Sequence, residues 1–290
     1  MSKISIYNNV KILNHDHPDF PNKLKNIENP PEILFALGNT KILNDTSIAI
    51  VGSRKCSDYG KNCAFNFAND ISKNNIRIIS GLAEGIDTYA HKGSVSNKTI
   101  AVIGSGFNQI YPRSNKKLIN EIISNGGVII SEYFFDVPAY PFNFPKRNRI
   151  VAALSNGIVV IEAGENSGAL ITVDLAKNLN KKIYVVPSNI DNIYSKGSNK
   201  LLQSNAKVVL SSNDILEDFI ANQLATKTQS INIPKEYENL YNSLKYNPQS
   251  ANALSKNLNT PISVINSSLT MMELSGYVYK LTDGKFKVNL

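Results

Sequence analysis

Cysteine and histidine are scarce in this chain, and their scarcity limits its redox and metal chemistry. The 290 residues include only two cysteines and three histidines. Cys56 and Cys63 are seven positions apart, in what we expect to be one loop and helix, so we expect no disulfide framework. His15, His17 and His91 are too scattered to form a metal-ligand spacing with them. We therefore interpret both cysteines as small apolar residues and expect no bound metal.

Long apolar runs are also absent. Apolar runs such as residues 158–161 (IVVI) are far short of the roughly 20 residues that cross a bilayer. The first 17 residues contain neither the apolar core nor the small-residue cleavage site of a secretory signal. These features predict a cytoplasmic protein that makes no membrane contact.

Known nucleotide and catalytic motifs are missing as well. The P-loop pattern Gly-x-x-x-x-Gly-Lys-Ser/Thr does not occur, and Gly104-Ser105-Gly106 lacks the third glycine and the downstream acidic residue of a dinucleotide fingerprint. No Ser-His-Asp or Cys-His set emerges from the pattern, and His91 falls within a predicted helix. These absences favour binding over catalysis, so we expect no cofactor, no catalytic residue and no enzyme activity.

Positive charge is in excess. The formal net charge is +8 and the pI is about 9.2. Residues 234–290 hold six Lys/Arg and four Asp/Glu, so most of the excess lies on residues 1–233. Such a balance favours a polyanionic partner, because each phosphate contact releases condensed counterions. Charge alone does not identify that partner.

The middle of the chain alternates short runs rich in Ile and Val with segments of helical spacing. Each run is apolar throughout, as expected for strands covered on both faces. This repetition predicts an α/β fold, with an extended Rossmann-like, doubly wound parallel sheet. The strands that we expect are residues 47–51, 77–80, 99–103, 127–131, 157–162, 182–187 and 207–210.

Four parts are predicted along the chain. Residues 1–46 are polar and proline-bearing, and we interpret them as an N-terminal extension with one brief helix. Residues 47–220 form the Rossmann-like domain. Residues 221–233 lack periodicity and are typical of a linker. Residues 234–290 form the last part, for which we expect a winged-helix domain.

The winged-helix prediction depends on the order of elements. Helices are predicted at residues 235–246, 249–258 and 261–275, followed by strands at 277–281 and 285–289. An Asp-Gly pair between the two strands is a strong hairpin signal. The third helix contains no Lys or Arg, so we expect it to read duplex DNA poorly. Its apolar residues suffice for a small core, with some left over; they are Ile262, Ile265, Leu269, Met272 and Leu274.

Ligands of an open parallel sheet bind beyond the carboxyl ends of its strands. Five loops at this edge offer glycines or small hydroxyl residues at the start of a helix, where backbone N–H groups favour an anion. The alternative is that these are simply tight turns between strands and helices. Full positive charges at this edge come from Arg54, Lys146, Arg147, Arg149 and Lys196. Of these, Arg54 and Arg147 are expected to lie in loops at the strand ends.

Aromatic residues interleave with cations near residue 145. Phe142 and Phe144 lie beside Lys146, Arg147 and Arg149. This arrangement suits a single strand, because exposed bases stack on rings while cations neutralise the backbone. The alternative places both phenylalanines in the core.

Six ordered stretches resemble the DNA-processing protein A (DprA, or Smf) family, over nearly the whole chain. The residues 30–38 (PPEILFALG) also look like that family's lead-in to its Rossmann-like domain. The six stretches are AIVGSR (49–54), SGLAEGIDTYAH (80–91), AVIGSGFNQIYP (101–112), FPKRNRIVAALS (144–155), VVIEAGENSGALIT (159–172) and KGSNKLLQSNA (196–206).

The resemblance implies binding of single-stranded DNA, a homodimer, an interaction with the recombinase RecA, and a role in natural transformation or related recombination. The 46 residues before the first predicted strand are too few for the N-terminal SAM-like domain of some members. The site implied by the resemblance, with Phe144 added for stacking, comprises Ser53, Arg54, Gly81, Ser105, Phe144, Lys146, Arg147, Asn148, Arg149, Ser167, Gly168 and Lys196.

Two other functions remain open from the sequence. Glu162 and the glycines at 164 and 168 occupy a place similar to the catalytic loop of phosphoribohydrolase-like Rossmann enzymes, although that family's Pro-Gly-Gly-x-Gly-Thr loop is absent. A winged-helix transcriptional regulator with a nucleotide-sensing domain is the second alternative. Hydrolysis of AMP would favour the enzyme, and a specific duplex footprint would favour the regulator.

Overall fold

The computed structural model describes residues 9–219, 234–245, 247–281 and 283–288. The chain divides into two compact units, one ending at Leu216 and one beginning at Glu217. The predicted linker, residues 221–233, lies outside the described residues.

The first unit is built on a nine-stranded sheet with the order β1-β2-β6-β5-β4-β3-β7-β8-β9. The strands from β3 onward are parallel, whereas β1 pairs with β2 and β2 with β6 in antiparallel register. The prediction of a mostly parallel α/β sheet is therefore confirmed. The strands are β1 (Val10–Asn14), β2 (Ile33–Gly38), β3 (Ser47–Val51), β4 (Arg77–Ser80), β5 (Ile100–Ile103), β6 (Val128–Ser131), β7 (Gly157–Val160), β8 (Lys182–Val185) and β9 (Lys207–Val208).

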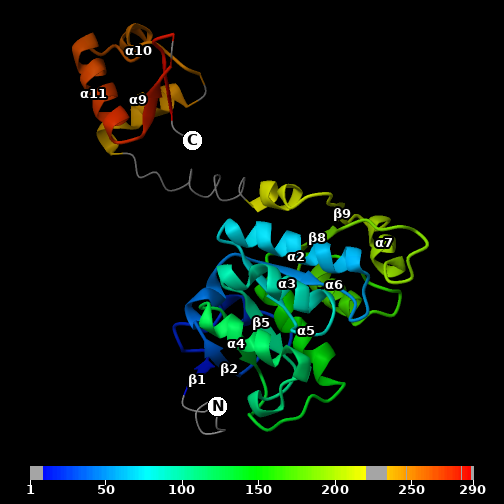
Figure 1. Ribbon diagram of the computed structural model, residues 1–290. Coiled ribbons are helices and arrows are strands. Elements are labelled where there is room, and N and C mark those ends of the chain that lie inside the picture. The colour runs from blue at the N-terminus through cyan, green and yellow to red at the C-terminus, as the bar shows by residue number, and fades with distance from the viewer. Residues whose placement is uncertain (1–8, 220–233, 246, 282, 289–290) are drawn as a thin grey trace. The chain divides into compact units, whose positions relative to one another are not determined.

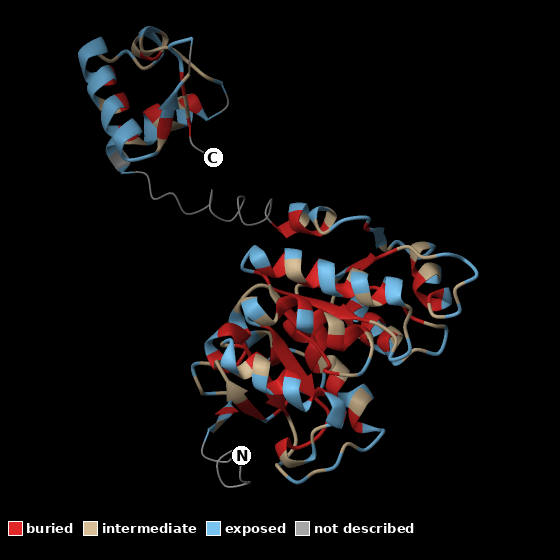
Figure 2. Ribbon diagram, in the orientation of Figure 1, coloured by how far each residue is buried: buried red, intermediate tan, exposed pale blue. Residues whose placement is uncertain are grey.

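Helices lie on both faces of this sheet (Figure 1). One core cluster joins α5 and α6 to one face, and a second joins α4 to the other. Buried residues run along the strands, whereas α2 carries exposed residues on its outer side (Figure 2). The helices are α2 (Asp58–Lys73), α3 (Ile86–Ser94), α4 (Lys116–Ser124), α5 (Asn143–Leu154), α6 (Gly168–Asn178) and α7 (Lys196–Leu202).

Serine residues fix where two of these helices begin. The Ser57 hydroxyl accepts a hydrogen bond from the Gly60 N–H at the start of α2, at 3.0 Å. The Ser167 hydroxyl accepts one from the Ala169 N–H at the start of α6, at 3.3 Å. Both contacts satisfy backbone donors that the helix itself leaves unpaired.

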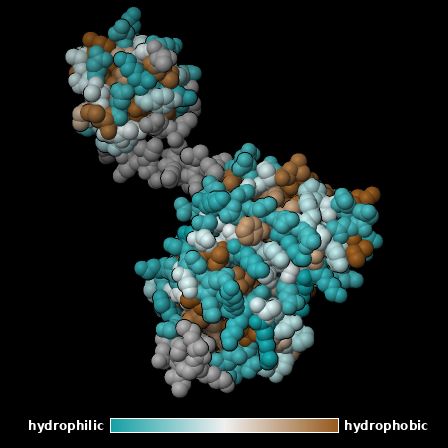
Figure 3. Space-filling model, viewed as in Figure 1, coloured by the Kyte–Doolittle hydropathy of each residue, from teal (hydrophilic) through white to brown (hydrophobic). Residues whose placement is uncertain are grey.

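Hydrophilic residues dominate the face of the molecule drawn in Figure 3, as expected for helices that turn their apolar side to the sheet.

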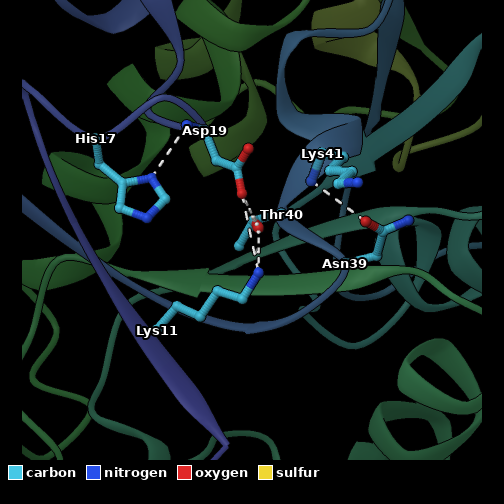
Figure 4. Close-up of polar contacts among 6 residues, drawn as sticks. All are labelled: Lys11, His17, Asp19, Asn39, Thr40 and Lys41. Atoms are coloured by element: carbon cyan, nitrogen blue, oxygen red, sulfur yellow. Dashed lines mark hydrogen bonds and ion pairs between the residues drawn. The ribbon is translucent and has the colours of Figure 1, made fainter.

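The N-terminal segment is more than an extension with one brief helix, and that expectation is wrong. It supplies β1 and β2, which extend the sheet beyond β6. A partly buried polar cluster links β1 to the segments that precede and follow β2 (Figure 4). The hydroxyl of the fully buried Thr40 donates to the Asp19 carboxylate at 2.5 Å and accepts from the Lys11 ammonium at 3.0 Å. Strand β1 gives little signal because it is an edge strand in which only Leu13 is fully buried, whereas the buried run Leu34–Ala36 of β2 is a usable signal.

The described part of the second unit from residue 234 onward has three α-helices followed by a two-stranded antiparallel sheet, in the order expected. The turn between the strands closes at Gly284, whose φ of +80° suits glycine. On α11, Ile265, Leu269 and Met272 join the small core, whereas Ile262 and Leu274 are exposed. The elements are α9 (Glu238–Leu244), α10 (Ala251–Asn257), α11 (Ile262–Leu274), β10 (Val278–Lys280) and β11 (Phe286–Val288).

Cys56 and Cys63 are free thiols, and burial raises the pKa of each, which disfavours a reactive thiolate. Among the described residues, no helix is long and apolar enough to cross a membrane.

His91 is a core residue of α3. It is fully buried, and its Nδ1 lies 2.9 Å from the hydroxyl oxygen of Thr99. That hydroxyl donates its own hydrogen to the Ile78 carbonyl, so its oxygen accepts from Nδ1–H. Burial lowers the pKa of His91 from 6.5 to about 3.

The free energy of unfolding is expected to depend on pH through His91. Between about pH 3 and 6.5 the unfolded chain binds a proton at this residue and the folded chain does not, so stability rises with pH. The contribution reaches at most about 1.4 kcal/mol per pH unit. His91→Asn, which keeps a donor for Thr99, should give a shallower slope of unfolding free energy between pH 4 and 6.5, measured by chemical denaturation. Identical slopes for the two proteins would contradict this assignment.

Candidate functional site

A cavity of about 810 Å³ opens at the carboxyl ends of the parallel strands. Its walls come from the loops after β3 and β4, from the segment that leads into α5, and from the start of α6. The predicted site residues that line it are Ser53, Arg54, Gly81, Phe144, Arg147, Asn148, Ser167 and Gly168. The structure thus brings together residues that are more than 110 positions apart in the sequence.

One wall combines a cation with two aromatic rings. The guanidinium carbon of the exposed Arg54 lies 4.9 Å from the centroid of the Phe144 ring. The Phe144 ring is in turn 6.1 Å from that of Tyr111, which is also exposed. Phe144 itself is half-buried and lines the cavity, so the alternative that places it in the core is wrong. This wall offers both a π-face and a full positive charge to a ligand.

Backbone and hydroxyl groups form the opposite wall. The Ser53 hydroxyl accepts from the Gly164 N–H at 3.2 Å and lies 3.4 Å from the Ser167 hydroxyl. The Asn148 amide donates to the Gly168 carbonyl at 3.3 Å. A Cβ added at Gly168 would meet no atom within 4 Å, so the first turn of α6 is open on that side. Open backbone at a helix start is a favourable place for an anion.

Arg147 forms the floor of the cavity. The sequence predicts it in a loop, and this is wrong because α5 already begins at Asn143. Its guanidinium is buried and donates to the carbonyls of Gly81 and Val102, which lie at the ends of β4 and β5. Burial lowers the pKa of Arg147 to about 10, and the nearby Asp87 carboxylate opposes this shift. Arg147 is therefore held by the protein rather than presented to a ligand.

Gly81 and Asp87 complete this buried arrangement. A Cβ at Gly81 would lie 2.5 Å from an Arg147 nitrogen, so only glycine leaves room for the guanidinium. The Asp87 carboxylate accepts from the N–H groups of Gly81 and Ala83 at 3.1 and 3.4 Å. Burial raises the pKa of Asp87, while the charge of Arg147 acts in the opposite direction.

Four predicted site residues do not line the cavity. Ser105 is buried, and its carbonyl accepts from the Ser131 hydroxyl at 2.7 Å. Arg149 pairs with Glu132 at 2.6 Å on the side of α5 that turns away. Lys146 and Lys196 are exposed outside the lining.

Some lining residues are not predicted as site residues from the sequence. Tyr111 stands within one of the stretches that resemble the DprA family, and an exposed aromatic after a glycine-rich loop is a usable signal. Tyr194 lies in the loop between β8 and α7, where the sequence pattern gives no signal for it.

Glu162 does not face the cavity. Its carboxylate is fully buried and accepts from the Ser57 N–H at 2.8 Å, the Ser57 hydroxyl at 2.6 Å and the Asn192 amide at 3.0 Å. It therefore ties the start of α2 to the loop after β8. Of the described residues that line the cavity, Asp87 alone carries a carboxylate. This lining offers no pair of carboxylates for acid–base work.

Comparison with known proteins places residues 11–220 in a family described as DNA recombination-mediator protein A. The chain is 40% identical over 202 residues to the DNA processing protein DprA of Streptococcus pneumoniae, covering 69% of this chain and 71% of that protein. It is 36% identical over 212 residues to the protein Smf of Escherichia coli, covering 72% of this chain and 57% of that protein. The match thus leaves a substantial part of each relative uncovered.

Two solved structures resemble the model closely. The X-ray structure of DprA from Streptococcus pneumoniae superposes with a TM-score of 0.69 at 36% identity, covering 74% of this chain and 76% of that one. A second structure is that of DNA processing protein A from Helicobacter pylori, described with its single-stranded DNA binding mode. It superposes with a TM-score of 0.68 at 29% identity, covering 73% of this chain and 96% of that one.

Replacing Arg147 is expected to destabilise the fold. Arg147→Met keeps an unbranched apolar stem, removes the donors of two buried carbonyls and leaves the Asp87 carboxylate buried without its opposite charge. The free energy of unfolding should fall by about 3–5 kcal/mol, measured by chemical denaturation. Arg54→Met is the matched control; Arg54 is exposed, so a change within about 0.5 kcal/mol is expected. Equal denaturation midpoints for Arg147→Met and the unaltered protein would show that the buried contacts carry no stability.

Proposed function

This chain belongs to the DNA recombination-mediator protein A family, and from that premise we propose that it binds single-stranded DNA and hands it to RecA. The role would lie in natural transformation or related homologous recombination. The observation that carries the proposal is the cavity at the strand ends. It combines an exposed cation, aromatic rings and an open helix start.

Each of these groups suits one part of a single strand. Bases that are free of a complementary strand can stack on the rings of Phe144 and Tyr111, whereas paired bases keep their faces covered. Arg54 and the open first turn of α6 at Gly168 suit phosphates. The Helicobacter pylori relative, whose structure is described with single-stranded DNA, supports the same ligand class.

Two partners belong to the proposal. Transfer to RecA is supported by family membership, because the family is described as a recombination mediator. Faster RecA filament formation on oligo-dT in the presence of this protein is the measurement that tests it. A homodimer is supported by the edge strand β9 and the residues just after it, since Val208 in the strand is 47% and Leu210 beyond it 79% exposed. The mass of the protein in solution tests the homodimer.

The enzyme alternative receives no support from the geometry. A phosphoribohydrolase-like mechanism would need the acid at Glu162, and that carboxylate is buried and hydrogen-bonded to Ser57 and Asn192. Release of adenine from AMP by the purified protein would revive this alternative.

For the second unit we infer a winged-helix domain that is auxiliary in DNA binding. The order of three helices and a hairpin supports this assignment. Helix α11 carries Glu273 and no cation. Two hairpin lysines are already engaged, since Lys285 pairs with Asp283 at 2.8 Å and the Lys280 ammonium lies 5.7 Å from the Phe286 ring. These contacts favour a minor role for the hairpin in gripping phosphates.

Oligo-dT is expected to bind more tightly than blunt duplex of equal length, with an affinity that falls with salt. Arg54→Ala should weaken oligo-dT binding by about 1–3 kcal/mol and make the slope of log affinity against log salt less steep by about 0.7. Fluorescence anisotropy in a salt series measures both quantities.

The control for that experiment is Lys73→Ala. Lys73 is an exposed cation in the last turn of α2, at the opposite edge of the sheet, so its loss should leave affinity unchanged. Equal affinity for duplex, or equal losses at Arg54 and Lys73, would falsify the assignment of this cavity to single strands.

Removal of the second unit should leave binding largely intact. A protein truncated after residue 233 is expected to stay folded and to bind oligo-dT within about tenfold of the full chain, because the cavity belongs entirely to the first unit. Affinity at fixed salt is the measurement, with circular dichroism to check folding. A hundredfold loss in a folded truncated protein would make the hairpin a primary site.

A further inference from the structure

An exposed pair of aromatic rings lies just outside the cavity. The rings of Tyr140 and Phe142 are stacked, with centroids 5.3 Å apart and planes only 8° from parallel. Tyr140 is 46% and Phe142 60% exposed, and neither ring joins a core cluster of the first unit. The alternative that places Phe142 in the core is therefore wrong. Two large rings held together at the surface, without a packing role, call for a ligand.

The segment that carries the pair is well fixed. Asn143, at the start of α5, is buried, and its amide donates to the carbonyls of Gly104 and Pro138 at 3.1 and 3.3 Å. The Tyr140 N–H donates to the Pro138 carbonyl at 2.9 Å, and its own carbonyl accepts from the Asn143 N–H at 3.0 Å. These bonds close the turn and hold the rings in place before any ligand arrives.

The pair is continuous with the cavity. Ala139 and Pro141 line the cavity, whereas Tyr140 and Phe142, the alternate residues of the same segment, are exposed outside its lining. A strand that leaves the cavity across this wall would meet the rings next. The Lys146 ammonium lies 5.7 Å from the Phe142 ring, so a cation stands beside the rings as well.

We propose that Tyr140 and Phe142 form a second stacking site, which takes the bases of a single strand where it leaves the cavity, while Lys146 neutralises an adjacent phosphate. Aromatic rings beside cations are the combination that binds single strands without sequence preference, because every base has a π-face. The inference rests on the proposed function, since it extends the same binding surface. Continuity with the cavity and the charge of Lys146 favour a nucleic-acid strand over a protein as the occupant.

The test compares oligo-dT of increasing length, from about 4 to about 16 nucleotides, with the full chain and with Phe142→Leu. Leucine keeps apolar bulk and removes the π-face. Short oligomers that fill only the cavity should bind both proteins equally. Longer ones should bind the variant roughly 5- to 100-fold more weakly, the range of one base stacked on one ring. Phe142→Trp keeps an aromatic ring, so its affinity should still increase with the length of the oligo-dT.

Phe134→Leu is the matched control. Phe134 is 69% exposed in the same stretch between β6 and α5, but its ring packs 5.2 Å from that of Phe35 and does not line the cavity. It should behave like the unaltered protein at every length. Thermal melts of all three variants check that each is folded.

Abasic sites separate stacking from any indirect effect of Phe142→Leu. A set of long oligo-dT molecules is made, each lacking one base at a different position. Removing a base that stacks on Tyr140 and Phe142 should lower the affinity of the unaltered protein but not that of Phe142→Leu. Equal affinities of the unaltered protein and Phe142→Leu at all lengths would overturn the second site alone. Failure of the unaltered protein to bind any oligo-dT would instead overturn the proposed function. A loss that is equal for short and long oligomers would also overturn the second site.

Discussion

The buried guanidinium of Arg147 is the contact on which the geometry of the cavity depends. It joins α5 to the ends of β4 and β5 through the carbonyls of Gly81 and Val102. A full charge is costly to bury, and here two backbone acceptors and the nearby Asp87 carboxylate offset that cost. The space for it exists because residue 81 has no Cβ. The position of Phe144, one turn earlier on α5, follows from this anchor.

Neighbouring cations in one stretch of sequence have different environments. In residues 146–149, Lys146 stands beside an exposed ring, Arg147 lies in the floor, and Arg149 pairs with Glu132. Helical geometry explains the difference, because successive residues are rotated by about 100° around α5 and therefore meet solvent, sheet and the β6 loop in turn. Composition alone would count these three cations as equivalent, although only Lys146 is presented to solvent.

Continuous apolar runs allowed the parallel strands β3 to β8 to be predicted, because burial on both faces demands them. The run at residues 207–210 located β9 as well, although β9 is an exposed edge strand. The Asp-Gly pair likewise located the hairpin of the second unit. Strand β1 gave no such run, since an edge strand needs few buried residues. At the site, Arg54 and Ser167 were predicted from their positions in loops at the strand ends, and both line the cavity. The burial of Arg147 and the pairing of Arg149 depend on contacts with Gly81 and Glu132, which only the folded chain brings near.

Helix α5 is anchored at its first turn, its middle and its end, and these anchors fix the binding surface before a ligand arrives. Asn143 bonds its first turn to the loop after β5, Arg147 holds its middle, and the Lys23 ammonium donates to the Leu154 carbonyl at its end, at 2.9 Å. The last contact comes from the N-terminal segment, which gives that segment a role in positioning the site. Because these anchors lie in the protein itself, the rings along α5 and its leading turn are in place without a ligand. Binding then loses little conformational freedom on the protein side, and most of the ordering cost falls on the flexible strand.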